Sequence, residues 1–435
     1  MKHAPYSERR QRVCARLGDG VAIIPTAPER LRNRDAHYPY RFDSYFWYLS
    51  GFPEPEAVLV LVGGSEARSI LFCREKNEER EIWDGFRYGP ASAAQAFGFA
   101  EAWPISELAS RLPQLLAKRS TLWHSLGHDA EWDRRIGEVL AGLRADSRNG
   151  QQAPGEIRDL HGLLDEMRLC KDSHELDCMQ RAADIAAAGH TRAMRACRPG
   201  IAEYELEAEL SYEFRRRGAS GHAYTPIVAG GVNACILHYV ANDKLLSGHS
   251  LVLIDAGCEI EGYASDITRT FPVGGRFSTE QRAVYEIVLA AQAAAIGAIR
   301  PGARFVDYHH AALRVLSQGL IDLGVLTGTA DAVIESEAYK PYYMHRTGHW
   351  LGLDVHDAGA YRTGSGDDDW VVLAPGMTLT VEPGLYLRPG DKVPEHLHGI
   401  GVRIEDDVLV TSTGSQVYTN APRTVGEIEE VMHHE

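Results

Sequence analysis

The sequence repeats one order of helix, stop and helix, and this repetition constrains the fold more than any other feature. "ADIAAAGHTRAMRACRPG" ends at Gly200, and "YEIVLAAQAAAIGAIRPG" ends at Gly302. Both stretches are alanine-rich with helical periodicity, and Pro-Gly stops each of them. An amphipathic stretch and then strand-like segments that carry histidines follow each copy. The matching order of elements indicates an internal duplication.

The two copies predict an α+β domain with an internal pseudo-two-fold repeat. Two such halves would lie with their sheets side by side and their helices outside. Ligand sites often lie in clefts between such halves. We therefore expect the functional residues where the two copies meet.

A smaller α/β domain is expected before the duplication. The chain has 435 residues, enough for two or three domains. "EAVLVLVGG" and "SILFC" are typical of buried strands, and the polar stretch "DSRNGQQAPGE" is a candidate linker. We expect an N-terminal domain over residues 1–155 and the duplicated domain over residues 156–435.

Bulk properties exclude several classes of function. The net charge of −15 argues against nucleic acid as a partner. No apolar run reaches membrane-spanning length, and the N-terminal stretch lacks the apolar segment of a signal peptide. The seven cysteines are scattered, without a C-x-x-C pair, which is typical of free thiols in a reducing compartment. A cytoplasmic protein that binds neither nucleic acid nor membrane is expected.

Two carboxylates lie in an otherwise apolar hairpin, "LVLIDAGCEIEGYASDITRTF" (251–271). A turn centred at residues 260–261 would place Asp255 directly opposite Asp266. Like charges at such a position destabilise a sheet, and an unpaired buried carboxylate is costly. Either a salt bridge to Arg269 or a bound cation would remove the conflict.

Three more residues favour the cation. Glu382 lies in "MTLTVEPG", Glu405 in "IGVRIEDDVLV" and His349 in "TGHWLGLDVHD". With Asp255 and Asp266 they make four carboxylates and one imidazole, whose charge two divalent ions would neutralise. Such oxygen-rich ligation suits manganese, with cobalt, iron or zinc as alternatives. Two ions about 3.5–4 Å apart form a hydrolytic centre that activates water.

The motifs now support a resemblance. "IDAG", "SDITRT", "HWLGLDVHD", "LTVEPGLY" and "GVRIEDD", in this order, resemble the dinuclear metallopeptidases with the pita-bread fold, over residues 163–432. "FWYLSGFPEPEAVLVL" and "EIWDGFRYG" are similar to the aminopeptidase P (Xaa-Pro aminopeptidase) branch. Prolidases, the dipeptidase branch, are the close relatives, and "APRTVGEIEEVM" resembles them too. The resemblance implies an exopeptidase for peptides with proline at the second position.

The same resemblance implies a role for each metal-ligating residue. Asp255 and Asp266 would hold one ion, and His349 and Glu382 would complete the site of the other. Asp266 and Glu405 would bridge the two ions. Glu382 would also accept the proton of the attacking water, which two divalent ions, expected to be Mn²⁺, would activate.

Four further residues are matched around the substrate and the ligands. His238 and His356 match histidines that contact the substrate carbonyl and the proline side of the scissile bond. His345 matches a third site histidine, and Arg403 matches a cation that steadies the ligand carboxylates. Core packing remains the alternative for His238, and hydrogen bonding at a strand end remains the alternative for His345.

Assembly and activity leave alternatives open as well. Trp83 either packs the N-terminal domain or, as the resemblance implies, lies near the site of a neighbouring subunit. A homodimer or homotetramer is expected. A creatinase-like enzyme without metal and a non-catalytic binding module of the same fold are the alternative functions. Both would be expected to lose ligands, whereas this chain keeps all five.

One segment departs from the family pattern. Members often carry an arginine just before "L-x-P-G-M" that holds the carboxylate side of the substrate. Here "GSGDDDWVVLAPGM" (364–377) has Asp367, Asp368 and Asp369 there, and Arg362 is the nearest basic residue. A dipeptide carboxylate needs a charge-assisted partner. Peptides longer than Xaa-Pro should therefore be preferred, unless Arg362 serves as the clamp.

Overall fold

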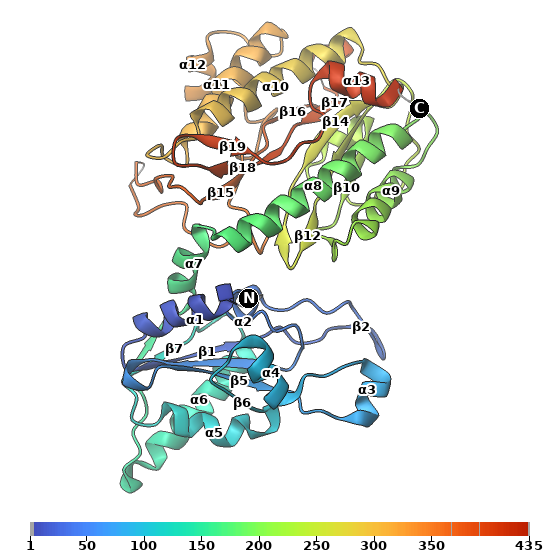
Figure 1. Ribbon diagram of the computed structural model, residues 1–435. Coiled ribbons are helices and arrows are strands. Elements are labelled where there is room, and N and C mark those ends of the chain that lie inside the picture. The colour runs from blue at the N-terminus through green and yellow to red at the C-terminus, as the bar shows by residue number, and fades with distance from the viewer. Residues whose placement is uncertain (1–3, 367, 391, 434–435) are drawn as a thin grey trace. The chain divides into compact units, whose positions relative to one another are not determined.

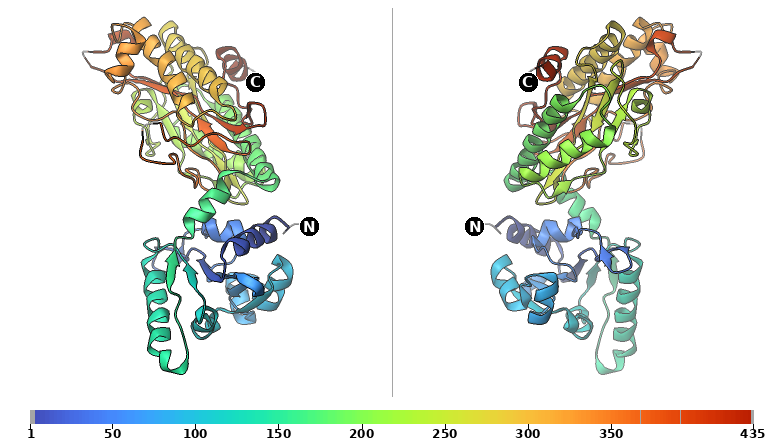
Figure 2. Two further views of the ribbon diagram at one scale, coloured as in Figure 1. Left: turned by 90° about the vertical axis from the view of Figure 1, so that its left-hand side faces the viewer. Right: turned by 90° about the vertical axis from the view of Figure 1, so that its right-hand side faces the viewer.

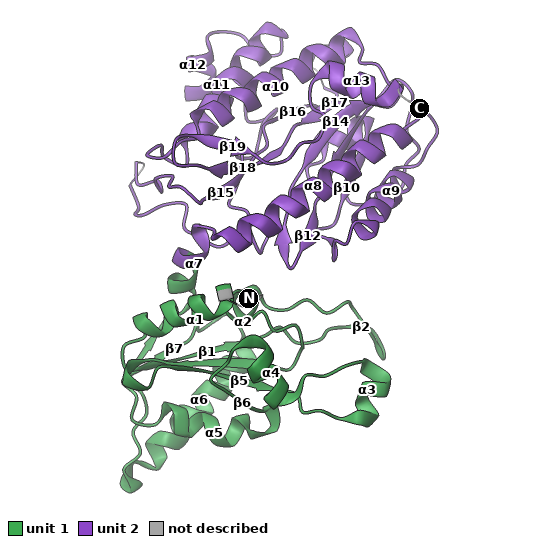
Figure 3. Ribbon diagram, viewed as in Figure 1, with its two compact units in different colours: residues 1–165 green, residues 166–435 purple. Residues whose placement is uncertain are grey.

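The computed structural model describes residues 4–366, 368–390 and 392–433. The chain divides into two compact units, unit 1 over residues 1–165 and unit 2 over residues 166–435, which Figure 3 colours separately. No helix among the described residues is both long and apolar enough to span a membrane.

The division lies further along the chain than the linker at residue 155 suggested. Strand β8 (Glu156–Arg158) pairs in parallel with β7 (Thr121–Trp123), so this segment completes the sheet of unit 1. Helix α7 (His161–Leu169) follows directly and contains the boundary. The polar stretch that looked like a linker therefore precedes the last strand of unit 1.

Unit 1 is built on a six-stranded mixed sheet with the order β6-β5-β4-β1-β7-β8. β4 pairs antiparallel with β1 and β5, and the other pairs are parallel. All five residues of β4, "VLVLV", are buried, as expected for a strand with both faces covered. The remaining strands are β1 (Gly20–Pro25), β4 (Val58–Val62), β5 (Arg68–Cys73) and β6 (Glu101–Pro104), and a separate hairpin joins β2 (Leu31–Asn33) and β3 (Ala36–His37).

Apolar helix faces cover this sheet. Leucines of α5 and α6 form one core cluster with valines of β1 and β4. The two apolar runs expected as buried strands are β4 and β5, which confirms that prediction. The helices of unit 1 are α1 (Ala4–Arg16), α2 (Ser44–Ser50), α3 (Glu78–Asp84), α4 (Gly89–Phe97), α5 (Leu108–Leu116) and α6 (Ala130–Ala145).

Unit 2 contains the duplicated pattern of helices. Each copy has a long helix, a Pro-Gly stop and a second helix that packs against the first. Gly200 and Gly302 adopt φ values of +85° and +86°, a region that side chains disfavour, so both stops require glycine. Figures 1 and 2 show the long helices α8 and α10 on the same side of the strands of this unit. The four helices are α8 (Ser173–Ala196), α9 (Glu203–Arg216), α10 (Thr279–Ala298) and α11 (Asp307–Asp322).

A three-stranded antiparallel sheet follows each helix pair, in the order β10-β11-β14 and then β15-β18-β19. This succession of helices and strands confirms the order read from the sequence. The strands are β10 (Ile227–Gly230), β11 (Leu251–Asp255), β14 (Thr268–Pro272), β15 (Thr378–Val381), β18 (Asp406–Val410) and β19 (Ser415–Val417). Short elements complete the unit: β9 (Gly221–His222), α12 (Ala330–Glu335) and α13 (Val425–His433).

Each half contains a long hairpin, and the ladder of backbone pairs between its two arms is interrupted. The first hairpin (251–272) runs from β11 through β12 (Cys258–Ile260) and β13 (Tyr263–Ala264) to β14. The second hairpin (378–410) runs from β15 through β16 (Gly384–Leu387) and β17 (Ile400–Arg403) to β18. Each ladder breaks once on the outgoing arm and once on the returning arm.

The turn of the first hairpin differs from the expected one. Glu261 and Gly262 have φ values of +52° and +82°, as in a two-residue type I′ turn. Asp255 therefore pairs with Thr268 and not with Asp266. The turn lies one residue later than predicted, which moves the partner of Asp255 by two residues, from Asp266 to Thr268. The turn lies there because Gly262 tolerates a positive φ.

Candidate metal centre

The breaks of the two hairpins deliver acids to one cavity of about 660 Å³. Asp255 ends β11, and Asp266 lies in the break before β14. Glu382 lies in the break after β15, and Glu405 lies in the break before β18. All four carboxylates line the cavity together with His349, so the structure brings the five expected ligands together.

His349 turns one ring nitrogen toward the acids. Its Nε2 lies 3.5 Å from Asp266 Oδ2 and 3.7 Å from Glu382 Oε1. Its Nδ1 lies 2.9 Å from the carbonyl oxygen of Trp350, to which a proton on Nδ1 is donated. This hydrogen bond fixes the tautomer that offers Nε2 as a ligand. Nε2 and one oxygen each of Asp266 and Glu405 lie within 4.8 Å of one another.

Arg403 occupies the position expected for a cation beside the ligands. It donates to Asp255 Oδ2 at 2.6 Å, to the Tyr386 hydroxyl at 3.1 Å and to Thr268 Oγ1 at 3.2 Å. The Thr268 hydroxyl in turn donates to Glu405 Oε2 at 2.7 Å. One guanidinium therefore holds acids from both hairpins in place.

Arg269, the alternative counter-charge, serves another acid. Its guanidinium pairs with Asp406 at 2.6 Å, and both side chains are fully buried. Its other donors bind backbone carbonyls. The alternative prediction, a salt bridge from Arg269 to Asp255 or Asp266, is therefore wrong.

Tyr224, which the sequence did not single out, bridges two of the acids. Its hydroxyl oxygen lies 2.6 Å from Asp255 Oδ1 and 2.5 Å from Asp266 Oδ1. A hydroxyl has one proton, so it donates to one carboxylate at a time. Nothing in "GHAYTPIV" distinguishes this tyrosine before the loop that carries it is folded against the first hairpin.

Burial raises the pKa of three of the acids. It raises the pKa of Glu405 well above the ordinary value, with the charges of Asp266 and Glu382 adding to the effect. It also raises the pKa of Asp255, and it raises that of Glu382 to about 7. Burial alone would lower the pKa of His349, but Asp266 and Glu382 raise it to about 9. Without cations these buried charges oppose one another, so this donor set fits divalent metal ions.

His345 has protein partners on both ring nitrogens. Nδ1 lies 2.7 Å from the carbonyl oxygen of Arg346, and Nε2 lies 2.7 Å from the Tyr386 hydroxyl. Nδ1 is also 3.8 Å from Glu382 Oε2. Burial and the charge of Arg403 lower the pKa of His345 to about 3. The geometry thus favours a neutral hydrogen-bonding residue that supports the centre.

His238 and His356 face the cavity from its exposed side. The His356 ring lies edge-on to His349, with centroids 4.2 Å apart. Burial and the nearby His349 lower the pKa of His356, which keeps it neutral near pH 7. The exposure of His238 argues against the core-packing alternative.

Buried charges anchor the segment that carries both His349 and His356. Asp357 accepts from Arg168 at 2.6 Å and from Lys171 at 2.9 Å, and all three side chains are almost fully buried. Burial would raise the pKa of Asp357, but the two cations hold it below its ordinary value. At the other end, a Cβ on Gly348 would lie 2.0 Å from the Thr380 carbonyl oxygen.

Two arginines and a tryptophan line another part of the cavity. The guanidinium of Arg362 lies 4.2 Å from the ring centroid of Trp370, and that of Arg346 lies 5.0 Å from it. The neighbouring acids point elsewhere. Asp368 pairs with Arg304 at 2.7 Å, and Asp369 accepts from the backbone of Gly366.

The sequence predicted a negative charge at this side of the cavity, and the structure corrects that prediction. Neither Asp368 nor Asp369 lines the cavity, and Asp367 lies outside the described residues. Sequence neighbours suggested repulsion of a substrate carboxylate, whereas the described lining at Trp370 contains Arg346 and Arg362 from two segments of the chain.

Comparisons with known proteins show the family of the chain. Residues 177–412 match metallopeptidase family M24, and residues 6–123 match the aminopeptidase P N-terminal domain. The Xaa-Pro aminopeptidase of Escherichia coli strain K12 is 44% identical over 98% of this chain and 97% of its own length. The solved aminopeptidase PepP of Pseudomonas aeruginosa is 50% identical, with a TM-score of 0.97 over 99% of this chain and 98% of its own. A zinc-substituted E. coli aminopeptidase P in complex with product is 43% identical, with a TM-score of 0.96 over 99% of this chain and 98% of its own.

The chain belongs to metallopeptidase family M24. The pita-bread domain with its pseudo-two-fold repeat, and the smaller α/β domain before it, are thereby confirmed.

Proposed function

We propose that Asp255, Asp266, His349, Glu382 and Glu405 hold two divalent ions and that this centre hydrolyses the bond between the first residue and a proline. The convergence of these five side chains in one cavity carries the proposal. The chain is a metal-dependent Xaa-Pro exopeptidase, because Xaa-Pro aminopeptidases match nearly its whole length. The oxygen-rich donor set supports manganese as the ion.

The residues divide between the two ions as the motifs imply. Asp255 and Asp266 would hold one ion, His349 and Glu382 would hold the other, and Asp266 and Glu405 would serve both. When bound, the ions lower the pKa of water and offset the charge that develops on the substrate oxygen. Arg403 and Tyr224 keep the carboxylates in position through the hydrogen bonds described above.

Glu382 moves the proton of the reaction. A proline nitrogen in a peptide bond carries no hydrogen, so it must gain a proton to leave as an amine. Glu382 lines the cavity next to His349, with Oε1 3.7 Å from Nε2, so it lies beside the position proposed for the attacking water. Its carboxylate accepts the proton of the attacking water and delivers it to that nitrogen.

His238 and His356 act on the substrate. Both are hydrogen-bonding groups that line the cavity, where one contacts the substrate carbonyl and the other contacts the proline side. The lining between them includes the apolar side chains of Leu237, Val240 and Val355, which suit a proline ring. His345 positions Tyr386 and Glu382 and does not touch the substrate.

The arginines on Trp370 favour short peptides. A carboxylate two or three residues from the N-terminus would meet Arg346 and Arg362, which offer charge-assisted hydrogen bonds. Xaa-Pro dipeptides are therefore substrates beside longer peptides, and the prolidase reaction is a second activity of the same centre.

Assembly and compartment complete the proposal. Trp83 and Ile82 on α3 are 79% and 81% exposed, and Phe86 is 64% exposed. An apolar group of this kind on a surface favours contact with another protein. We assign it to the interface of a homodimer or homotetramer. The negative charge and the cysteine pattern favour the cytoplasm.

The decisive experiment incubates the manganese-loaded protein with Xaa-Pro and Xaa-Pro-Yaa peptides and identifies the products by mass. We expect release of the first residue, inhibition by EDTA and recovery with Mn²⁺. Matched Xaa-Ala-Yaa peptides serve as controls and should be poor substrates. Full activity in excess EDTA, or equal cleavage of the alanine peptides, would contradict the proposal.

A further inference from the structure

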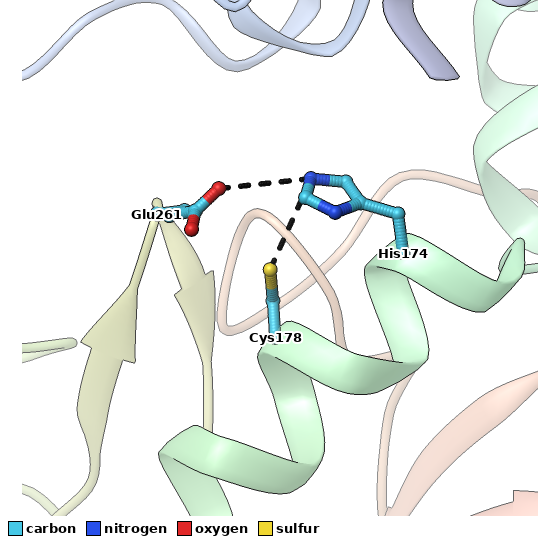
Figure 4. A group of neighbouring side chains, drawn as sticks. All are labelled: His174, Cys178 and Glu261. Atoms are coloured by element: carbon cyan, nitrogen blue, oxygen red, sulfur yellow. Dashed lines mark hydrogen bonds and ion pairs between the residues drawn. The ribbon is translucent and has the colours of Figure 1, made fainter. Parts of the chain in front are cut away.

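A second cluster of metal-ligating side chains lies in unit 2, outside the residues that line the cavity. Figure 4 shows His174 and Cys178 on helix α8 and Glu261 at the turn of the first hairpin. One ligand atom of each, a ring nitrogen, a sulfur and a carboxylate oxygen, lies within 4.8 Å of the other two. None of the three residues has a role in the hydrolytic centre.

The distances are close to those of a tetrahedral metal site. His174 Nε2 lies 4.0 Å from Cys178 Sγ and 3.7 Å from Glu261 Oε2. Zinc holds sulfur at about 2.3 Å and nitrogen or oxygen at about 2.0–2.2 Å, which puts neighbouring ligand atoms roughly 3.3–3.8 Å apart. Small rotations of these side chains would therefore bring all three onto one ion.

The protein holds the two helical ligands in fixed positions. His174 and Cys178 are four residues apart, so their side chains lie above one another on one face of α8. Asp172 and Glu175 form a capping box that orders the first turn, which includes His174. Cys178 is fully buried, so its sulfur cannot turn out to the solvent.

The third ligand stands at an unusual backbone position. Glu261 has a φ of +52° at the first position of a two-residue turn, where glycine, asparagine and aspartate are favoured. A longer side chain at such a position is disfavoured. Its carboxylate reaches from the turn of the hairpin to the face of α8.

We propose that His174, Cys178 and Glu261 form a binding site for a Zn²⁺-like ion. Imidazole, thiolate and carboxylate together suit zinc, with water in the fourth position. The Cys178 thiol loses its proton to the solvent as the sulfur–metal bond forms. The thiolate and the carboxylate then balance the two charges of the ion, so the occupied site is neutral overall.

An ion at this site would tie two elements that matter for catalysis. It joins the first turn of α8 to the turn of the hairpin that carries Asp255 and Asp266. The site is therefore structural, and its occupancy stiffens the support of the catalytic acids. Arg181 lies 3.6 Å from the other oxygen, Glu261 Oε1, which leaves the contact between Oε2 and His174 in place.

The test uses cobalt, because sulfur distinguishes this site from the hydrolytic centre. The full-length protein loaded with manganese is titrated with Co²⁺ and followed by absorption spectroscopy. We expect a near-ultraviolet thiolate-to-cobalt charge-transfer band, which ligands of oxygen and nitrogen cannot produce. The band should be lost in Cys178→Ser and reduced in His174→Ala and Glu261→Gln.

Zinc content gives a second, independent measurement. After equilibration with Zn²⁺ and gel filtration, the three variants should each hold about one equivalent less than the wild type. Cys197→Ser, at the other end of α8, is the matched control and should keep both the band and the zinc. His174 is half-buried and Glu261 is exposed, so the variants at these two positions keep the test valid if Cys178→Ser does not fold. A wild type without the band, or zinc contents equal in all variants, would overturn the proposal.

Discussion

The two hairpins of unit 2 deliver their acids in the same way but with side chains of different length. In the first, Asp255 is the last residue of β11 and pairs with Thr268 across the ladder. In the second, Glu382 comes directly after the pair Val381–Asp406, so it lies just outside the ladder. The shorter acid sits on the strand, and the longer acid sits in the break.

The cause of the break also differs. In the first hairpin a Cβ on Gly257 would lie 1.7 Å from the Ser265 carbonyl oxygen, so the two arms cross too closely for a side chain. In the second hairpin Pro383 follows Glu382, and proline has no N–H to give to the ladder. Strand pairing is thus interrupted next to an acid in both halves. The cause is crowding in the first half and a missing N–H donor in the second.

We expect the largest effect from replacing Asp266, the acid in the returning arm of the first hairpin. Asp266→Asn removes one charge and one ligand atom, so metal content and hydrolysis should fall together, with kcat/KM lower by about a thousandfold or more. Metal analysis and peptide assays measure both. Asp368→Asn, an exposed acid outside the cavity, is the control and should change neither. Unchanged metal content in Asp266→Asn would show that the ligands are misassigned.

Crowding at the first break predicts a large loss of stability. Gly257→Ala introduces a Cβ against a carbonyl oxygen, and the free energy of unfolding should fall by about 3 kcal/mol. Gly297→Ala in α10 meets no atom within 4 Å and should be neutral or slightly stabilising. Urea unfolding of the metal-loaded proteins compares them. Equal stability of both variants would mean that the arms separate easily at this point.

The acid of the second break should give the metal-free protein an unusual dependence on pH. Burial raises the pKa of Glu382 from 4.5 to about 7 in the folded state. A carboxyl whose pKa is raised on folding stabilises the folded state below pH 4.5, and this contribution is lost as the pH rises through 7.

The melting temperature of the EDTA-treated wild type should therefore fall across this window relative to that of Glu382→Gln. The metal-loaded protein should not show the difference, because the ions take the place of the proton. Parallel curves for the metal-free wild type and Glu382→Gln would contradict the raised pKa.

The smallest effect concerns the part of the cavity that belongs to neither hairpin. Arg362→Ala removes a cation beside Trp370, so kcat/KM for Xaa-Pro should fall about tenfold relative to Xaa-Pro-Yaa amides, about 1.4 kcal/mol. Arg304→Ala removes an arginine that pairs with Asp368 and should leave the ratio unchanged. A ratio that is equally unchanged in Arg362→Ala would assign carboxylate capture to Arg346 or to no arginine.

The sequence predicted what depends on the identity of residues and their order. The duplication, the β4 and β5 strands and the convergence of the five expected ligands on one cavity follow from such patterns. Prediction from the sequence failed where the exact position of a turn or the path of a loop decides which residues meet. The turn at Glu261 moved by one residue, so Asp255 and Asp266 are not cross-strand partners.

Contacts between segments far apart in the chain could not be predicted from the sequence either. Tyr224 reaches Asp255 and Asp266 only because its loop folds over the first hairpin. Arg346 joins Arg362 at Trp370 from another segment, while the intervening loop turns Asp368 away. No local pattern encodes these approaches, because each depends on packing that the whole of unit 2 decides.

The distribution of the acids over two hairpins has a consequence for the enzyme during its own synthesis. A ribosome releases Asp255 and Asp266 well before Glu382 and Glu405 are synthesised. Until the last of them has emerged and the hydrogen bond from Thr268 to Glu405 has formed, a growing chain has only half of a centre. With the proposed ligands, the enzyme would gain its activity only when its own translation is nearly finished, so it would not cleave neighbouring nascent peptides before then.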